Sequence, residues 1–131
     1  MRTLGFTLLV ALVLPLAAVA QSSAHAASGS SAAQIPAYVA KAINDPARAA
    51  DRKDDARRKI ADVMAFAGVK PGDKVVDLVP GSGYWTRVFS RIVGPGGHVY
   101  QVWPDEMAKY SAKSFANWQG LAKDTYTNVS L

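Results

Sequence analysis

The sequence predicts an α/β fold, a three-layer sandwich in which a parallel sheet lies between layers of helices. A buried strand over residues 74–79 runs into a glycine turn and then into an amphipathic helix over residues 84–93. A second strand, residues 98–103, follows the glycine-rich turn at 94–97, so the two strands are parallel with a right-handed crossover. Residues 126–131 have the pattern of a third strand.

The glycine turn after the first strand is the most informative local feature. Pro80 and Gly81 suit the central positions of a type II turn, in which Gly81 takes a positive φ. Val79 precedes a proline, and we therefore expect it to be extended and to prolong the strand.

Such turns hold dinucleotides as well as S-adenosylmethionine. Thr86 stands where the third glycine of a dinucleotide fingerprint would fall, which disfavours NAD and FAD. A carboxylate at Asp77 would repel a pyrophosphate, whereas it can bind the ammonium group of S-adenosylmethionine. The alternative is that Asp77 caps the turn and that the glycines only permit tight packing.

The stretch VVDLVPGSGYWT, residues 75–86, resembles motif I of class I S-adenosylmethionine-dependent methyltransferases. From residue 47 to the end, the chain resembles a group of exported bacterial predicted methyltransferases. In the family motif an acid and one further residue precede G-x-G-x-G; Gly81 and Gly83 match it, and Val79 replaces its first glycine. The resemblance implies a Rossmann-like fold with strand order 3-2-1-4-5-7-6. Strands 1 to 3 fall within this sequence, so we expect a truncated domain, the N-terminal cofactor half, without an identifiable catalytic residue.

The resemblance also implies S-adenosylmethionine as the cofactor. In the family an acid at the end of strand 2 binds the ribose hydroxyls, and Trp103 occupies that position here. Trp103 is expected either to stack on the adenine or to join the core, and Asp105 either to replace the acid or to cap a helix over residues 105–121. The expected cofactor-binding residues are Asp77, Gly81, Ser82, Gly83, Trp103 and Asp105.

Residues 1–26 have the pattern of a signal peptide and its cleavage region. Arg2 precedes an apolar run, and the A-x-A rule fits cleavage after Ala20 or Ala26. We expect a mature chain that begins at Gln21 or Ala27 and is periplasmic or secreted. The alternative is an uncleaved anchor, which would be the only membrane contact.

Two regions are expected to follow the leader. Residues 27–46 read as a spacer with a short helix at 35–43, and residues 47–131 as the partial methyltransferase domain. Residues 47–67 are expected to form a longer helix, with Gly68 as its C-cap. The charged first half of that helix is either a solvated face or a lid that brings Arg57 or Arg58 over the ligand carboxylate.

Composition excludes several classes of function. The chain has 131 residues and no cysteine, which excludes disulfides, thiolate catalysis and cysteine metal sites, and we predict no metal site. The net charge is +5, but its basic residues form no aromatic-interleaved stripe, so no nucleic-acid partner is expected. His98 is expected to be a structural hydrogen-bonding residue.

Two functions stay open at this point. The first is the cofactor-binding half of an S-adenosylmethionine-dependent methyltransferase whose acceptor substrate is unknown. The alternative is an exported, non-catalytic Rossmann-like binding module, which is favoured by Val79, Trp103 and the export signal.

Overall fold

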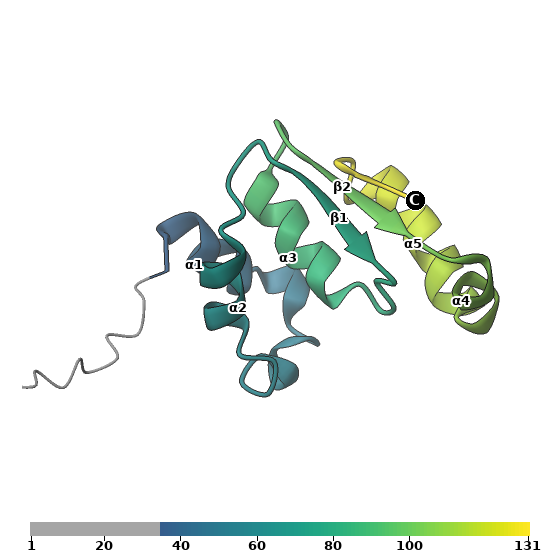
Figure 1. Ribbon diagram of the computed structural model, residues 1–131, viewed down its shortest axis with the longest axis horizontal. Coiled ribbons are helices and arrows are strands. Elements are labelled where there is room, and N and C mark those ends of the chain that lie inside the picture. Colours follow the sequence, from purple (N-terminus) through teal and green to yellow (C-terminus); the bar gives the residue numbers. More distant parts are fainter. Residues whose placement is uncertain (1–34) are drawn as a thin grey trace, which may run out of the picture.

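The computed structural model describes residues 35–131, so the expected signal peptide, its cleavage sites and most of the spacer lie outside the described residues. Figure 1 shows the elements in their order along the chain. They are α1 (Ala37–Ile43), the 3-10 turns η1 (Pro46–Arg48) and η2 (Arg52–Asp54), α2 (Ile60–Ala67), β1 (Lys74–Leu78), α3 (Tyr84–Val93), β2 (His98–Val102), α4 (Asp105–Tyr110), α5 (Ala112–Asp124) and β3 (Val129–Ser130).

The sheet confirms the predicted parallel topology. Its order is β1-β2-β3, with Val75 opposite Val99 and Val99 opposite Val129. The third strand is shorter than predicted, because the N–H of Val129 donates to the carbonyl of Tyr126 and closes a turn just before it. Within the described residues β1 pairs only with β2, so it forms an edge of the sheet.

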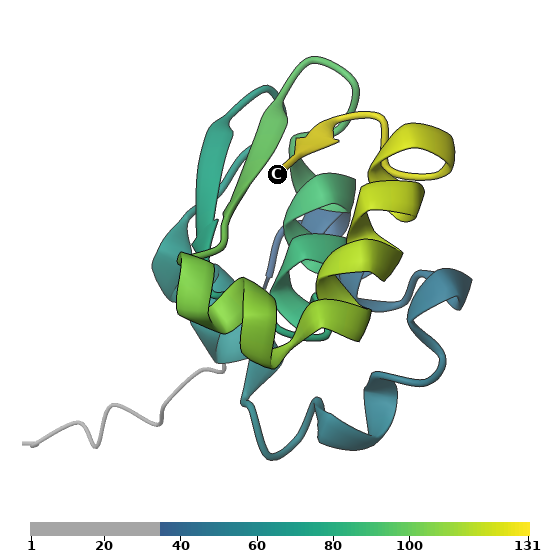
Figure 2. The same ribbon diagram turned by 90° about the vertical axis from the view of Figure 1, so that its right-hand side faces the viewer.

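The prediction of helices on both faces of the sheet is wrong for the described residues. Both α3 and α5 lie on one face (Figure 2), where Trp118 and Val99 are fully buried. The sheet grows in one direction from β1 to β3, and successive right-handed crossovers in one direction place their helices on the same side. The other face exposes apolar residues at register-matched positions of β1 and β2: Val76, Leu78, Tyr100 and Val102.

Helices α1 and α2 pack against the outer side of α3 (Figure 1). The buried residues of this layer are Val39, Ala42, Ile60, Met64, Tyr84, Val88 and Ile92. The short helix predicted within residues 35–43 is therefore present, and it belongs to the packed body of the chain.

The long helix predicted over residues 47–67 is wrong in its first half. Two 3-10 turns replace it, and α2 begins only at Ile60. The cause is tertiary: Arg48 is 1% exposed and its guanidinium donates to the carbonyl of Ile43 and, at 2.8 Å, to Asp55. These contacts outweigh weak ion pairs along one helix face. Gly68 is confirmed as the C-cap, with φ 61° and a hydrogen bond to Met64.

The helix predicted over residues 105–121 is interrupted. Ser111, at φ −109° and ψ 35°, separates α4 from α5, and α5 continues to Asp124. No helix within residues 35–131 is long and apolar enough to cross a membrane.

Candidate functional site

The glycine turn differs from the predicted one in its register. The hydrogen bond that closes it runs from the N–H of Gly83 to the carbonyl of Pro80, at 2.8 Å, so the turn begins one residue later than the predicted type II turn. Gly81 has φ 56°, which confirms the predicted positive φ. Val79 is not extended: its φ is 55°, while its N–H still donates to Val102 at 2.9 Å. The ladder to β2 and the turn together hold this β-branched residue in a region that favours glycine.

The two glycines of the turn have different surroundings. A Cβ on Gly81 would meet no atom within 4 Å, so the turn is open to a ligand there. A Cβ on Gly83 would lie 2.0 Å from Cζ2 of Trp118, whose indole N–H donates to the carbonyl of Ser82 at 3.2 Å. Packing against α5 is thus one reason for the second glycine. Sequence reasoning missed this contact, because nothing in the local pattern links α5 to the turn.

A buried chain of hydrogen bonds joins the ends of β1 and β2. The indole N–H of Trp103 donates to Oε1 of Gln101 at 2.9 Å, and Nε2 of Gln101 donates to Oγ1 of Thr86 at 2.8 Å. The Thr86 hydroxyl donates to Oδ2 of Asp77 at 2.5 Å. An indole nitrogen can only donate, which fixes the orientation of the Gln101 amide and hence the direction of the chain. Sequence reasoning missed Thr86 and Gln101, although Gln101 stands directly opposite Asp77 in the parallel register.

Asp77 is a buried carboxyl group. Only 7% of the residue is exposed, and within the described residues it forms no ion pair. Burial raises its pKa, and the hydrogen bonds from the hydroxyl and backbone N–H of Thr86 act in the opposite direction. An ammonium group placed beside it would relieve the cost of a buried negative charge.

Trp103 and Asp105 follow the end of β2. Trp103 is half-buried and packs edge-on against Phe115 of α5, with the ring centroids 5.4 Å apart. Asp105 is exposed and is the first residue of α4. The six predicted cofactor-binding residues therefore lie at or just beyond the carboxyl ends of β1 and β2. His98 lies at the other end of β2, where its ring bonds to Ser130 at 3.0 Å, as the structural prediction requires.

The charged segment before α2 borders the glycine turn. Nε and Nη2 of Arg87 donate to the two carboxylate oxygens of Asp51, each at 2.7 Å. Nη1 of Arg87 donates to the carbonyl of Ser82 at 3.0 Å. One arginine of α3 thus ties residues 46–59 to the turn. The charged segment, expected as either a solvated face or a lid, lies beside the turn as a loop with 3-10 turns in place of a helix.

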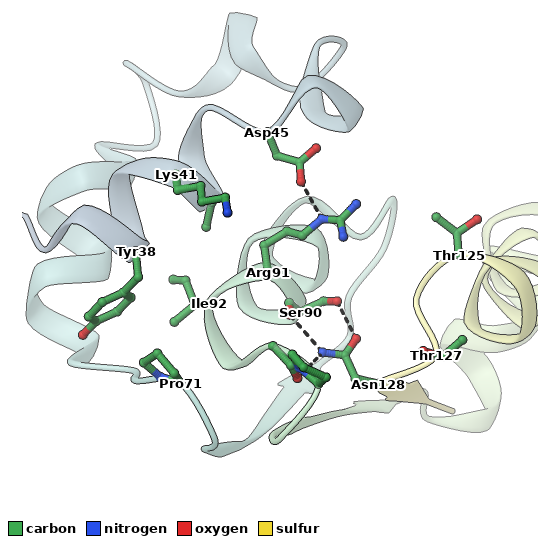
Figure 3. Close-up of a pocket in the computed structure, with 13 residues that line it drawn as sticks. Tyr38, Lys41, Asp45, Pro71, Ser90, Arg91, Ile92, Thr125, Thr127 and Asn128 are labelled. Carbon is green, nitrogen blue, oxygen red and sulfur yellow. Dashed lines mark hydrogen bonds and ion pairs between the residues drawn. The ribbon is translucent and has the colours of Figure 1, made fainter.

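A cleft of about 540 Å³ lies at the opposite end of α3 (Figure 3). Arg91 and Asp45 form an ion pair of 2.5 Å on its wall, and Ser90 is hydrogen-bonded to Asn128. None of the predicted cofactor-binding residues lines this cleft. Ligands of open α/β sheets bind outside the carboxyl ends of the strands, so the glycine turn, which lies at those ends, is the candidate cofactor site.

A parallel βαβ unit with an acid at the end of its first strand and a glycine turn at the same edge has the Rossmann-like architecture of class I S-adenosylmethionine-dependent methyltransferases. The family model described as protein-L-isoaspartate(D-aspartate) O-methyltransferase (PCMT) matches residues 37–131. The chain belongs to this family. The cofactor that this relationship implies is S-adenosylmethionine.

Curated relatives share short stretches with the chain. A protein-L-isoaspartate O-methyltransferase of Ignicoccus hospitalis is 42% identical over 43 residues, which cover 33% of this chain and 20% of that protein. A ubiquinone/menaquinone biosynthesis C-methyltransferase UbiE of Pseudomonas paraeruginosa is 47% identical over 36 residues, which cover 28% of this chain and 14% of that protein. The chain thus spans a fifth or less of these relatives' lengths.

Among solved structures, a SAM-dependent methyltransferase of Aquifex aeolicus superposes with a TM-score of 0.40 and 25% identity. The superposition covers 71% of this chain and 45% of that one.

Proposed function

We propose that residues 37–131 form the cofactor-binding part of an S-adenosylmethionine-dependent methyltransferase. The observation that carries this proposal is the pairing of the buried Asp77 with the open, positive-φ turn at Gly81, at the edge where β1 and β2 end. The acid suits the ammonium group of the cofactor, and the open turn lets the backbone approach it.

The other residues of the site have distinct roles in this proposal. Ser82 and Gly83 complete the turn beneath the amino-acid part of the cofactor, and Trp103 and Asp105 flank the adenosine. S-adenosylmethionine supplies an intrinsically activated methyl group when bound. The residues of this chain bind and orient it, and alignment with an acceptor is the main contribution a protein makes to such a reaction.

The curated relatives carry names that refer to different acceptors, protein isoaspartate in one case and ubiquinone/menaquinone biosynthesis in the other. The part that these relatives share with this chain therefore supports a common cofactor site, and the acceptor is left open.

Export is part of the same proposal. We propose a cleavable signal peptide within residues 1–26 and a periplasmic or secreted mature protein, because Arg2, an apolar run and two A-x-A sites occur in that order. The intact mass of the protein from a periplasmic fraction tests this. We expect a chain that begins at Gln21 or Ala27, and a species that retains Met1 in the membrane fraction would contradict cleavage.

Calorimetry tests the cofactor site directly. The purified chain should bind S-adenosylmethionine and S-adenosylhomocysteine, and both Asp77→Ala and Gly81→Val should weaken that binding while the protein stays folded. Absence of binding to the folded wild-type chain, or binding that neither substitution changes, would remove the proposal.

A second candidate is an exported, non-catalytic Rossmann-like binding module. It is favoured by Trp103, whose indole N–H is already bonded to Gln101 and which offers no acceptor to the ribose hydroxyls. Loss of a charged acceptor costs about 1.5–3 kcal/mol per hydrogen bond. Incubation with methyl-labelled S-adenosylmethionine and an extract of the same cells separates the candidates, since only the enzyme labels an acceptor.

A further inference from the structure

Carboxylates and arginines cluster between residues 46–59 and α3, and most of these charges are matched. Asp55 pairs with Arg48 at 2.8 Å, and Asp51 accepts hydrogen bonds from Nε and Nη2 of Arg87. Asp54 pairs with the exposed Arg57 at 2.9 Å. Each carboxylate of this cluster is thus bound by an arginine.

Arg58 is held differently from Arg48, Arg57 and Arg87, which all pair with carboxylates. Its Nε is buried and finds no acceptor among the described residues, and its guanidinium forms no ion pair there. The guanidinium carbon lies 4.5 Å from the ring centroid of Tyr84, in a cation–π contact. Arg58 as a whole is half-buried. Among the described residues the guanidinium thus has no carboxylate within ion-pair distance, although its charge lowers the pKa of the nearby Asp54.

The position of Arg58 relates it to the glycine turn. Tyr84, on which it stacks, directly follows Gly83 and is the first residue of α3. The Tyr84 hydroxyl donates to Asp55 at 2.5 Å, which fixes the ring and hence the surface beneath the guanidinium. The same loop is tied to the carbonyl of Ser82 through Asp51 and Arg87. The loop that carries Arg58 is therefore bound to the glycine turn, where we propose the cofactor site.

We propose that Arg58 binds the carboxylate of the amino-acid part of S-adenosylmethionine, an inference that rests on the proposed function. A planar guanidinium matches a carboxylate with two parallel hydrogen bonds, and an arginine stacked on an aromatic ring is already oriented for them. Asp77 and Arg58 then recognise opposite charges of the same group, the ammonium and the carboxylate. Arg57 is excluded from this role because it pairs with Asp54 and its side chain is 69% exposed.

The test compares two ligands and two neighbouring substitutions. S-adenosylhomocysteine carries the amino-acid carboxylate, whereas 5′-methylthioadenosine has the adenosine without the amino-acid part. In calorimetry, Arg58→Gln should weaken binding of S-adenosylhomocysteine by roughly tenfold or more and leave methylthioadenosine within about twofold. Arg57→Gln removes the same charge from the adjacent position, and it should leave both affinities unchanged.

The outcomes separate the two proposals. Equal effects of Arg58→Gln on both ligands, or an equal effect of Arg57→Gln, would remove the role of Arg58 and leave the cofactor site standing. A folded wild-type chain that binds neither ligand would remove the proposed function, and Arg58 with it. If Arg58→Gln does not fold, Arg58→Lys keeps the charge and loses the paired hydrogen bonds. It should weaken S-adenosylhomocysteine selectively, and a variant that binds both ligands as the wild type does would contradict the proposal.

Discussion

Val79 holds a β-branched side chain at φ 55°, in a region that costs such residues roughly 1–2 kcal/mol. We expect Val79→Gly to raise the free energy of unfolding by about 1 kcal/mol, because the relieved strain exceeds the entropy that a glycine adds to the unfolded chain. Urea denaturation measures this change in the free energy of unfolding. Val76→Gly is the matched control, since Val76 lies within β1 and its replacement should lower stability instead. Equal destabilisation by both would show that Val79 is unstrained.

Asp77 gives stability a characteristic pH dependence. Burial raises the pKa of Asp77 in the folded state above the unfolded value of 3.8. Its contribution to the free energy of unfolding is therefore fully present below pH 3.8, where the carboxyl is protonated, and is lost as pH rises through the folded pKa. Asparagine cannot ionise. The free energy of unfolding of Asp77→Asn, relative to wild type, should therefore increase from about pH 3 to about pH 7 in urea titrations.

Asp54 provides a control of opposite sign for that titration. A hydrogen bond from Arg57 lowers its pKa, so its contribution is present above the unfolded pKa and is lost as pH falls through the folded pKa. The relative stability of Asp54→Asn should change in the opposite direction to that of Asp77→Asn. The same direction for both variants would contradict the assignment of a buried, raised pKa to Asp77.

At the scale of elements, the docking of α5 onto the glycine turn decides how the turn tolerates substitution. Gly83→Ala brings a Cβ to 2.0 Å from Trp118, whereas Gly81→Ala meets nothing within 4 Å. Both glycines have positive φ, so alanine at either position carries a backbone cost of about 1–2 kcal/mol. Gly83→Ala should lose a further ~1–3 kcal/mol through overpacking. Thermal unfolding compares them, and equal losses would mean that α5 does not pack on the turn.

Elements whose ends are marked by local chemistry could be predicted from the sequence. The bounds of α3 agree with the prediction, because Gly83 and Gly94 flank an amphipathic run. The first half of the predicted helix at residues 47–67 could not be predicted correctly, since the burial of Arg48 among carboxylates depends on α3 and on the end of α1. The break at Ser111 likewise carries no glycine or proline that would announce it.

In the candidate site, too, the residues that could be predicted are those set by a local sequence pattern. Asp77 and Gly81 follow from the strand–turn pattern, and both lie at the predicted edge of the sheet. The hydrogen bonds that connect Thr86 and Gln101 to Asp77 need the register of β1 and β2, which the sequence does not specify. The left-handed Val79 was missed because the residue after it is a proline, whose local preference for an extended neighbour is overridden by the turn.

At the scale of the whole molecule, the order of strand, helix and strand along the chain predicts the parallel sheet. It does not predict how the helices are distributed over the two faces of that sheet. Successive crossovers in one direction leave one face of the sheet without a covering helix among residues 35–131, with Leu78 66% exposed and Val76 63% exposed. The same topology brings the ends of β1 and β2 together beside the charged loop at residues 46–59. It thereby separates the candidate cofactor site from the cleft at the far end of α3 (Figure 3).

The position of ligand binding tests the central claim most directly. In amide and indole nuclear magnetic resonance spectra of the chain, titration with S-adenosylhomocysteine should shift Gly81, Ser82, Gly83 and the indole of Trp103. Thr127 and Asn128, which line the cleft at the other end of α3, should stay unchanged. Shifts confined to Thr127 and Asn128, or a spectrum of the folded chain that the ligand leaves unaltered, would contradict a cofactor site at the glycine turn.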